Sequence, residues 1–150
     1  MQGLIQDSSV AAVSRVIQLS VAPVFLLLGI GSLLLVMTSR LARIVDRARQ
    51  VDAAVESGKE PGRLREELAT LAVRAGLVYR AIACLILAAL LVCGVVVALF
   101  VGASFTVDAA PAAATMFVLA MIIIVVGLLL FLREVFVATR AIRIGRDGPL

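Results

Sequence analysis

The sequence of 150 residues contains no histidine and no tryptophan, and only one tyrosine, two cysteines and one lysine. Histidine is the commonest general base and metal ligand among side chains, so its absence removes the most usual arrangements for nucleophilic catalysis and zinc binding. Cys84 and Cys93 lie nine residues apart in one apolar run. On a helix this places them on opposite faces, too far apart to form a disulfide bond with each other. We therefore expect no enzymatic activity, no catalytic residue, no metal site and no cofactor.

Charged residues are also scarce, at 16% of the chain, whereas hydrophobic residues make up 63% and the mean hydropathy is +1.15. A soluble domain is about half apolar, so this composition excludes ordinary water-soluble behaviour and intrinsic disorder. Three uncharged apolar stretches stand out, at 16–39, 81–105 and 112–132. Each has the roughly 20 residues that a helix needs to cross a bilayer. The sequence predicts an all-α integral membrane protein with three transmembrane helices.

The 14 basic residues, 13 of them arginine, are unevenly distributed. Nine lie in the connection 40–80 and four more follow in the C-terminal extension 133–150, whereas the loop 106–111 carries Asp108 and no basic residue. Lys and Arg gather on the cytoplasmic side of membrane proteins, so the high pI reflects topology, and we expect no nucleic-acid partner. The pattern predicts a bacterial inner-membrane protein with its N-terminus outside and its C-terminus in the cytoplasm.

The N-terminal segment 1–15 begins MQGLIQD and has no basic residue before Arg15, so it lacks the basic leader of a cleavable signal. Its polar and apolar residues fall on opposite faces of a helix. This favours either a short helix at the outer interface or a tilted beginning of the first span. Pro23 is either a kink between the two or an early position of the spanning helix.

The connection 40–80 has apolar residues at helical spacing on both sides of the turn-forming segment 57–62. Both stripes run into a transmembrane stretch without a break. We therefore expect the first two spans to continue into the cytoplasm as an antiparallel helical hairpin, which is too short to be a self-sufficient coiled coil and would pack against its copies or a partner. The two stripes consist of Leu41, Ile44, Val45, Ala48, Val51 and Val55, and of Leu64, Leu68, Leu71, Ala72, Ala75 and Val78.

Four segments of the chain resemble a known family. They are Ala22–Gly31 (APVFLLLGIG), Ser39–Arg49 (SRLARIVDRAR), Tyr79–Ile82 (YRAI) and Phe131–Val135 (FLREV). Together they resemble a bacterial family of small, uncharacterised three-span membrane proteins, and the resemblance extends over most of the chain. It implies a membrane protein without an assigned activity, and it transfers no catalytic residue.

Several charged residues lie near the expected cytoplasmic boundary. One interpretation is that the arginines extend into the headgroup layer and contact lipid phosphates. The other is a fixed network in which Arg40 or Arg43, with Arg80, neutralises Glu134, since an unpaired carboxylate at this depth is costly. The candidate residues for either role are Arg40, Arg43, Asp46, Arg47, Arg80, Arg133 and Glu134.

Small residues recur in two of the spans and would allow helices to approach closely. They serve either packing within one chain or self-association between copies. The residues are Gly29, Gly31 and Ser32 in the first span, and Gly94, Ala98 and Gly102 in the second.

Two functions remain open from the sequence. A homo-oligomeric membrane scaffold would use the basic hairpin to bind anionic lipid headgroups or a cytoplasmic protein. A homo-oligomeric ion or small-solute channel would instead have a ring of arginines at its cytoplasmic mouth. The scaffold is favoured because a helix face that lines a pore usually carries more polar residues than Ser20, Ser32 and Thr38.

Overall fold

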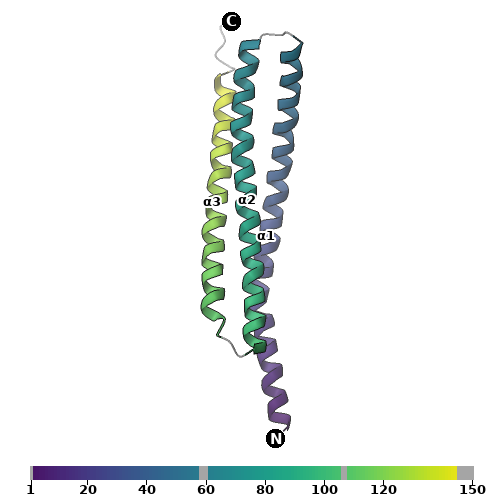
Figure 1. Ribbon diagram of the computed structural model, residues 1–150, viewed down its shortest axis with the longest axis vertical. Helices are drawn as coiled ribbons and strands as arrows, with labels where there is room; N and C mark the ends of the chain where they lie inside the picture. Colours follow the sequence, from purple (N-terminus) through teal and green to yellow (C-terminus); the bar gives the residue numbers. More distant parts are fainter. Residues whose placement is uncertain (1, 58–60, 106–107, 145–150) are drawn as a thin grey trace. The chain divides into compact units, whose positions relative to one another are not determined.

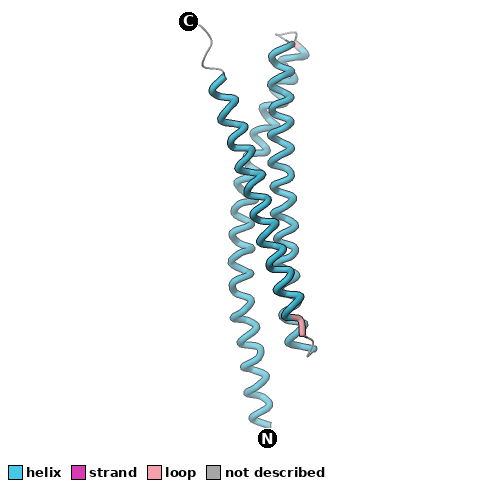
Figure 2. The backbone as a smooth tube through the Cα atoms, turned by 90° about the vertical axis from the view of Figure 1, so that its left-hand side faces the viewer, coloured by secondary structure: helices cyan, strands magenta, loops and turns pink. Residues whose placement is uncertain are grey.

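The chain folds into three long helices, seen in a computed structural model (Figures 1 and 2). The structure describes the backbone of residues 2–57, 61–105 and 108–144. Apart from Ser14, the side chains of segment 1–15 lie outside the described residues, as do the arginines of the C-terminal extension beyond Thr139. Side chains are described at Ser14, Ile17 and Gln18 and over 21–57, 62–104 and 108–139.

The helices are α1 (Gln2–Glu56), α2 (Pro61–Phe105) and α3 (Ala110–Ile144). Proline starts α2, where its fixed φ suits a first helical position and its missing N–H leaves no bond unmade. Before α3, the carboxylate of Asp108 accepts a hydrogen bond from the N–H of Ala110 at 3.3 Å, which satisfies one of the unpaired donors of the first turn. Both helix starts are therefore determined by local sequence.

All three helices are long and apolar enough to cross a membrane. The qualifying segments are Val21–Glu56, Gly62–Ser104 and Ala110–Thr139, with 36, 43 and 30 residues. About 20 residues suffice to cross the hydrocarbon layer, so each helix continues beyond it. The prediction of an all-α protein with three membrane-spanning helices, the first two extended as an antiparallel hairpin, is confirmed.

Helix α1 is continuous from Gln2 and includes Pro23, which is buried inside the helix. No irregular segment therefore separates the N-terminal residues from the first span. Pro23 thus lies inside one long helix that includes the N-terminal segment and the first span.

The helices form two compact units, each with a segment of all three helices. The first consists of Met1–Ser32 and Leu85–Ile124, and the second of Leu33–Cys84 and Val125–Leu150. Within the second unit α2 runs antiparallel to α1 (Figure 1), and α3 packs on this pair. The second unit contains the hairpin and almost every charged residue singled out from the sequence.

Buried residues follow a seven-residue spacing along each helix. This is the coiled-coil heptad, in which side chains of neighbouring helices interlock at two positions of every repeat. On α3 the buried residues at this spacing are small, except for the last one, which is Glu134. The series are Ile30, Met37, Ile44 and Val51 on α1; Leu71, Val78, Leu85 and Val92, with Ala81, Ala88 and Val95, on α2; and Ala113, Ala120, Gly127 and Glu134 on α3.

Candidate functional site

Glu134 is a charged residue in a core position, with an exposed fraction of 0%. Arg74 of α2 donates two hydrogen bonds to its Oε1, from Nε at 3.1 Å and from Nη2 at 3.0 Å. Arg40 of α1 lies on the other side, with Nη1 3.4 Å from Oε2. Since a buried carboxylate is tolerated only when paired, the two guanidinium groups make this position possible and tie all three helices of the second unit together.

The two arginines are not equivalent partners. Glu134 Oε2 accepts no hydrogen bond from any described residue, so the contact with Arg40 is an ion pair without an aligned hydrogen bond. The guanidinium of Arg40 also lies 5.4 Å from the centre of the Phe131 ring, at the range of a cation–π interaction. Arg74 is therefore the main partner of Glu134, while Arg40 divides its charge between the carboxylate and an aromatic face.

A second ion pair joins the arms of the hairpin farther along. Arg47 Nη2 lies 2.8 Å from Glu67 Oε1, and Nε donates to the same oxygen at 2.9 Å. Their side chains are 55% and 36% exposed, so this pair contributes at most about 1 kcal/mol. Seven residues separate Arg40 from Arg47 on α1, and seven separate Glu67 from Arg74 on α2. The charged groups thus keep the same heptad register as the apolar core.

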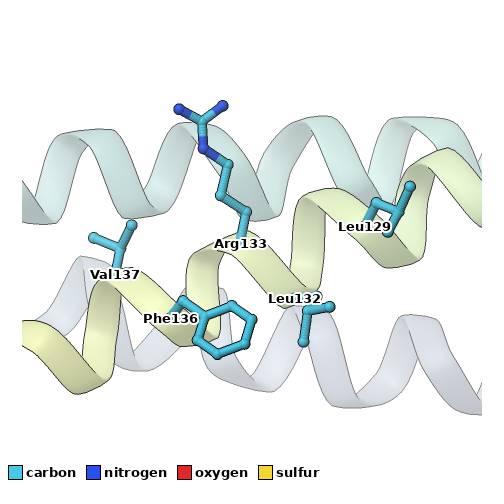
Figure 3. Close-up of a pocket in the computed structure, with 5 residues that line it drawn as sticks. All are labelled: Leu129, Leu132, Arg133, Phe136 and Val137. Atoms are coloured by element: carbon cyan, nitrogen blue, oxygen red, sulfur yellow. The ribbon is translucent and has the colours of Figure 1, made fainter.

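Among the hollows on the described part of the second unit, three bear on the candidate site. One, of about 200 Å³, is lined by four arginines and two apolar residues: Arg40, Arg43, Ile44, Arg47, Leu71 and Arg74. Another, of about 390 Å³, lies along the two apolar stripes of the hairpin and is lined by residues from 44–52 on α1 and from 68–75 on α2. The third, of about 540 Å³, lies on α3, where Arg133 extends away from Leu132 and Phe136 (Figure 3). Of these three, the first brings several charges of one sign together.

The structure brings together only part of the residue set expected at the boundary. Arg40 contacts Glu134, whereas Arg80 and Arg133 are exposed and take no part in the Glu134 cluster. Arg43 is exposed and donates to the backbone carbonyl of Ser39 at 3.4 Å. The remaining two residues of the set are Arg47, which pairs with Glu67, and Asp46, which is exposed.

Arg74 is the functional residue that sequence reasoning missed. Depth along the helix favours Arg80, because it adjoins the apolar stretch of α2 and so lies level with the other boundary charges. Arg74 instead lies seven residues before Ala81, in the same heptad position as Ala81, Ala88 and Val95. The sequence does not show this, because the stretch 81–105 is uncharged on every face; the burial of Ala81, Ala88 and Val95 marks the face that Arg74 continues.

The small residues divide into two groups. A Cβ added at Gly94 would lie 3.2 Å from Sδ of Met116 on α3, so Gly94 serves close packing within the first unit. Ala98 and Gly102 are partly exposed. Gly29 and Gly31 are exposed and have no other heavy atom within 4 Å of such a Cβ, and the exposed Ser32 donates to the carbonyl of Leu28. The small residues of α1 therefore leave open space on the surface.

Three long apolar helices define this chain as a multi-pass α-helical membrane protein. It belongs to the family described as "Protein of unknown function (DUF2721)", whose model matches residues 20–144. Membership of an uncharacterised family, expected from the four sequence segments, is thereby confirmed. The match includes Arg40, Arg74 and Glu134. Comparisons with curated proteins and with solved structures gave no match.

Replacing Glu134 by glutamine is expected to lower the free energy of unfolding by about 1–2 kcal/mol. The amide oxygen can still accept from Arg74, but the bonds lose their charge assistance, and both guanidinium groups are exposed enough, at 20% and 32%, to be partly solvated by water. Glu67→Gln is the matched control on the exposed pair, with an expected loss below about 0.5 kcal/mol. Unfolding by SDS in mixed micelles measures both, and an unchanged stability for Glu134→Gln would refute the network.

Proposed function

We propose that the protein is a non-enzymatic, homo-oligomeric membrane scaffold that holds a basic helical hairpin in the cytoplasm for interaction with other molecules. The observation that carries this proposal is the fully buried Glu134, tied to Arg40 on α1 and Arg74 on α2. The ion pairs attach the base of the hairpin to the third helix. A hairpin held in this way presents a fixed surface, because moving either arm away from α3 breaks one of the two ion pairs of a buried carboxylate.

The charge distribution supports a cytoplasmic location for this hairpin, at the inner membrane of a bacterium. Nine basic residues lie between the first two spans, and none lies in the loop 106–111. Arginine and lysine near the ends of spans are retained on the cytoplasmic side. This orientation places the N-terminus outside and the hairpin together with the C-terminus inside.

The exposure of the spans supports self-association. In the most apolar window of each spanning helix, only 17%, 22% and 17% of the residues are buried. Three helices enclose little interior, so most apolar side chains face lipid or another copy. Gly29 and Gly31 add a place on α1 where a second helix could approach closely.

The number of copies and the absence of a pore can be tested together. The purified chain in detergent is expected to give a defined homo-oligomer by native mass spectrometry. Liposomes that contain it are expected to pass ions and small solutes no faster than empty ones. A monomer would contradict the homo-oligomer, whereas protein-dependent flux would replace the scaffold with the channel considered from the sequence.

The hairpin itself is tested by shortening it. In the short variant, a Gly-Ser connection replaces residues 48–66. The deletion lies between Arg47 and Glu67, so it keeps both of these residues and the Glu134 cluster. A photo-crosslinking residue at the exposed Val73 should give a discrete protein adduct in native membranes for the full-length hairpin and none for the short one. Unchanged stability and copy number are the control. An adduct that persists in the short variant would contradict the scaffold role of the hairpin.

A further inference from the structure

The hollow of about 200 Å³ in the second unit has four arginines, Arg40, Arg43, Arg47 and Arg74, among its six lining residues. The volume corresponds to roughly six or seven water molecules, which is enough for a phosphate-sized group. Ile44 of α1 and Leu71 of α2, which are both buried, complete its wall. The position of the hollow is therefore determined by the same heptad packing that forms the core.

The charges around this hollow do not balance. Two carboxylates contact its arginines, because Glu134 pairs with Arg40 and Arg74 while Glu67 pairs with Arg47. Arg43 donates to a neutral backbone carbonyl, and the structure gives it no ion pair with Asp46 or any other described acidic residue. Four positive groups therefore face two negative ones. The hollow keeps an excess of two positive charges, which an anion would neutralise.

The donors that remain suit phosphate in particular. Each guanidinium carries five N–H groups in a planar fork, of which the contacts described above occupy at most two. Planar forks bind phosphate oxygens through paired, charge-assisted hydrogen bonds, and several arginines can share one tetrahedral group. The hollow thus combines volume, excess charge and unused donors of the right geometry.

The position of the hollow along the helices determines which phosphates can reach it. Arg40 is the first charged residue after the apolar stretch 16–39, and Arg74 lies seven residues, or about 10 Å, outside the apolar stretch of α2 that begins at Ala81. Tyr79, 68% exposed, occupies the boundary between them, where tyrosine is enriched in membrane proteins. The headgroup layer is about 5–8 Å thick on each side of the hydrocarbon. The hollow therefore extends from the level of headgroup phosphates, beside Arg40 and Arg43, to the water beyond them, beside Arg47 and Arg74.

We infer that the arginine hollow formed by Arg40, Arg43, Arg47 and Arg74 is a binding site for a phosphate group, supplied either by an anionic phospholipid headgroup or by free phosphate. This inference rests on the proposed role of the hairpin as an interaction surface, and it identifies phosphate groups as the class of ligand that the hairpin binds. Arg40 and Arg74 serve two purposes here, since they neutralise Glu134 on one side and face the anion on the other. Arg43, which holds no carboxylate in the described part of the chain, contributes the charge that is available for the ligand.

The test compares two variants of the full chain in nanodiscs. Arg43→Gln removes one guanidinium from the hollow and leaves the Glu134 cluster intact. Arg49→Gln makes the same charge change on the same helix at an exposed residue that does not line the hollow. One arm titrates inorganic phosphate into phosphatidylcholine discs by calorimetry. The other measures, by native mass spectrometry, how much phosphatidylglycerol the chain retains from mixed discs.

Binding in at least one arm is expected, weakened about tenfold by Arg43→Gln and less than twofold by Arg49→Gln. Binding in the phosphatidylglycerol arm alone assigns a lipid headgroup, and binding in the phosphate arm assigns a ligand from solution. No binding in either arm, or equal weakening by both variants, would overturn the inference. The hairpin lacking residues 48–66 retains all six lining residues, so it should bind phosphate like the full chain. The adduct at Val73 therefore tests the scaffold role of the hairpin, and phosphate binding tests the hollow, so one proposal can fail without the other.

Discussion

Replacing Arg74 by methionine is expected to lower the free energy of unfolding by about 3–5 kcal/mol, the largest effect of any single substitution considered. The change removes both hydrogen bonds to Oε1 of Glu134 and leaves a carboxylate that is 0% exposed. The remaining partner, Arg40, lies 3.4 Å from Oε2 without an aligned hydrogen bond. Removing one member of a buried ion pair costs this much because the other charge stays buried and uncompensated.

The double variant Arg74→Met with Glu134→Leu is the decisive control for this prediction. It replaces both charged groups by apolar side chains of similar size, and Arg40, already 32% exposed, can turn to water. Most of the stability is expected to return, because a buried ion pair is often no more stabilising than apolar packing. SDS unfolding in mixed micelles of the unsubstituted chain, Arg74→Met, Glu134→Leu and the double variant gives a complete double-mutant cycle. Additive losses would show that Arg74 and Glu134 do not act as a pair.

Replacing Gly94 by leucine is expected to lower the free energy of unfolding by about 2–3 kcal/mol. A Cβ at this position already lies 3.2 Å from Sδ of Met116, and the larger side chain would separate α2 from α3 in the first unit. Overpacking of a close helix contact typically costs this amount. Gly94→Ala is expected to be nearly neutral, since the flexible end of Met116 can shift and alanine favours the helix.

Gly29→Leu is the matched substitution on α1, with a different expected result. Nothing lies within 4 Å of the added Cβ, so the stability of the single chain should be unchanged or slightly raised. If this face joins copies, the association measured by native mass spectrometry or analytical ultracentrifugation should weaken at least about tenfold. Unchanged association would exclude Gly29 from an interface, and lower stability of the single chain would contradict the open space seen beside it.

Much of the fold could be predicted because it depends on local patterns. The lengths of the charge-free stretches predict the spans, and the segment 57–62 predicts the turn between two helical arms. Part of the candidate site was predictable as well. A carboxylate beside a span needs a positive partner, so the sequence offers a network around Glu134, with Arg40 among its expected partners.

The choice of Arg74 over Arg80 could not be made from depth alone. Distance along the helix favours Arg80, whereas the direction of the side chain around the helix decides which arginine can reach Glu134. Arg74 shares a heptad position with Ala81, and Arg80 does not. The same reason explains why Gly94 packs against Met116 while Gly29 stays open, although both are small residues in apolar spans.

The long stretches without charge and the arginines beside them thus determined the class of protein, the number of spans and the residues at the boundary. Whether a stretch of chain lies in the membrane depends mainly on the hydropathy and charge of its own residues, so the linear sequence is sufficient to predict it. Tertiary structure alone decided which charges meet, because Arg40, Arg74 and Glu134 come from three helices and depend on the register between them. It also decided that four arginines surround one hollow with two carboxylates beside them, and this excess of positive charge supports the proposed phosphate site.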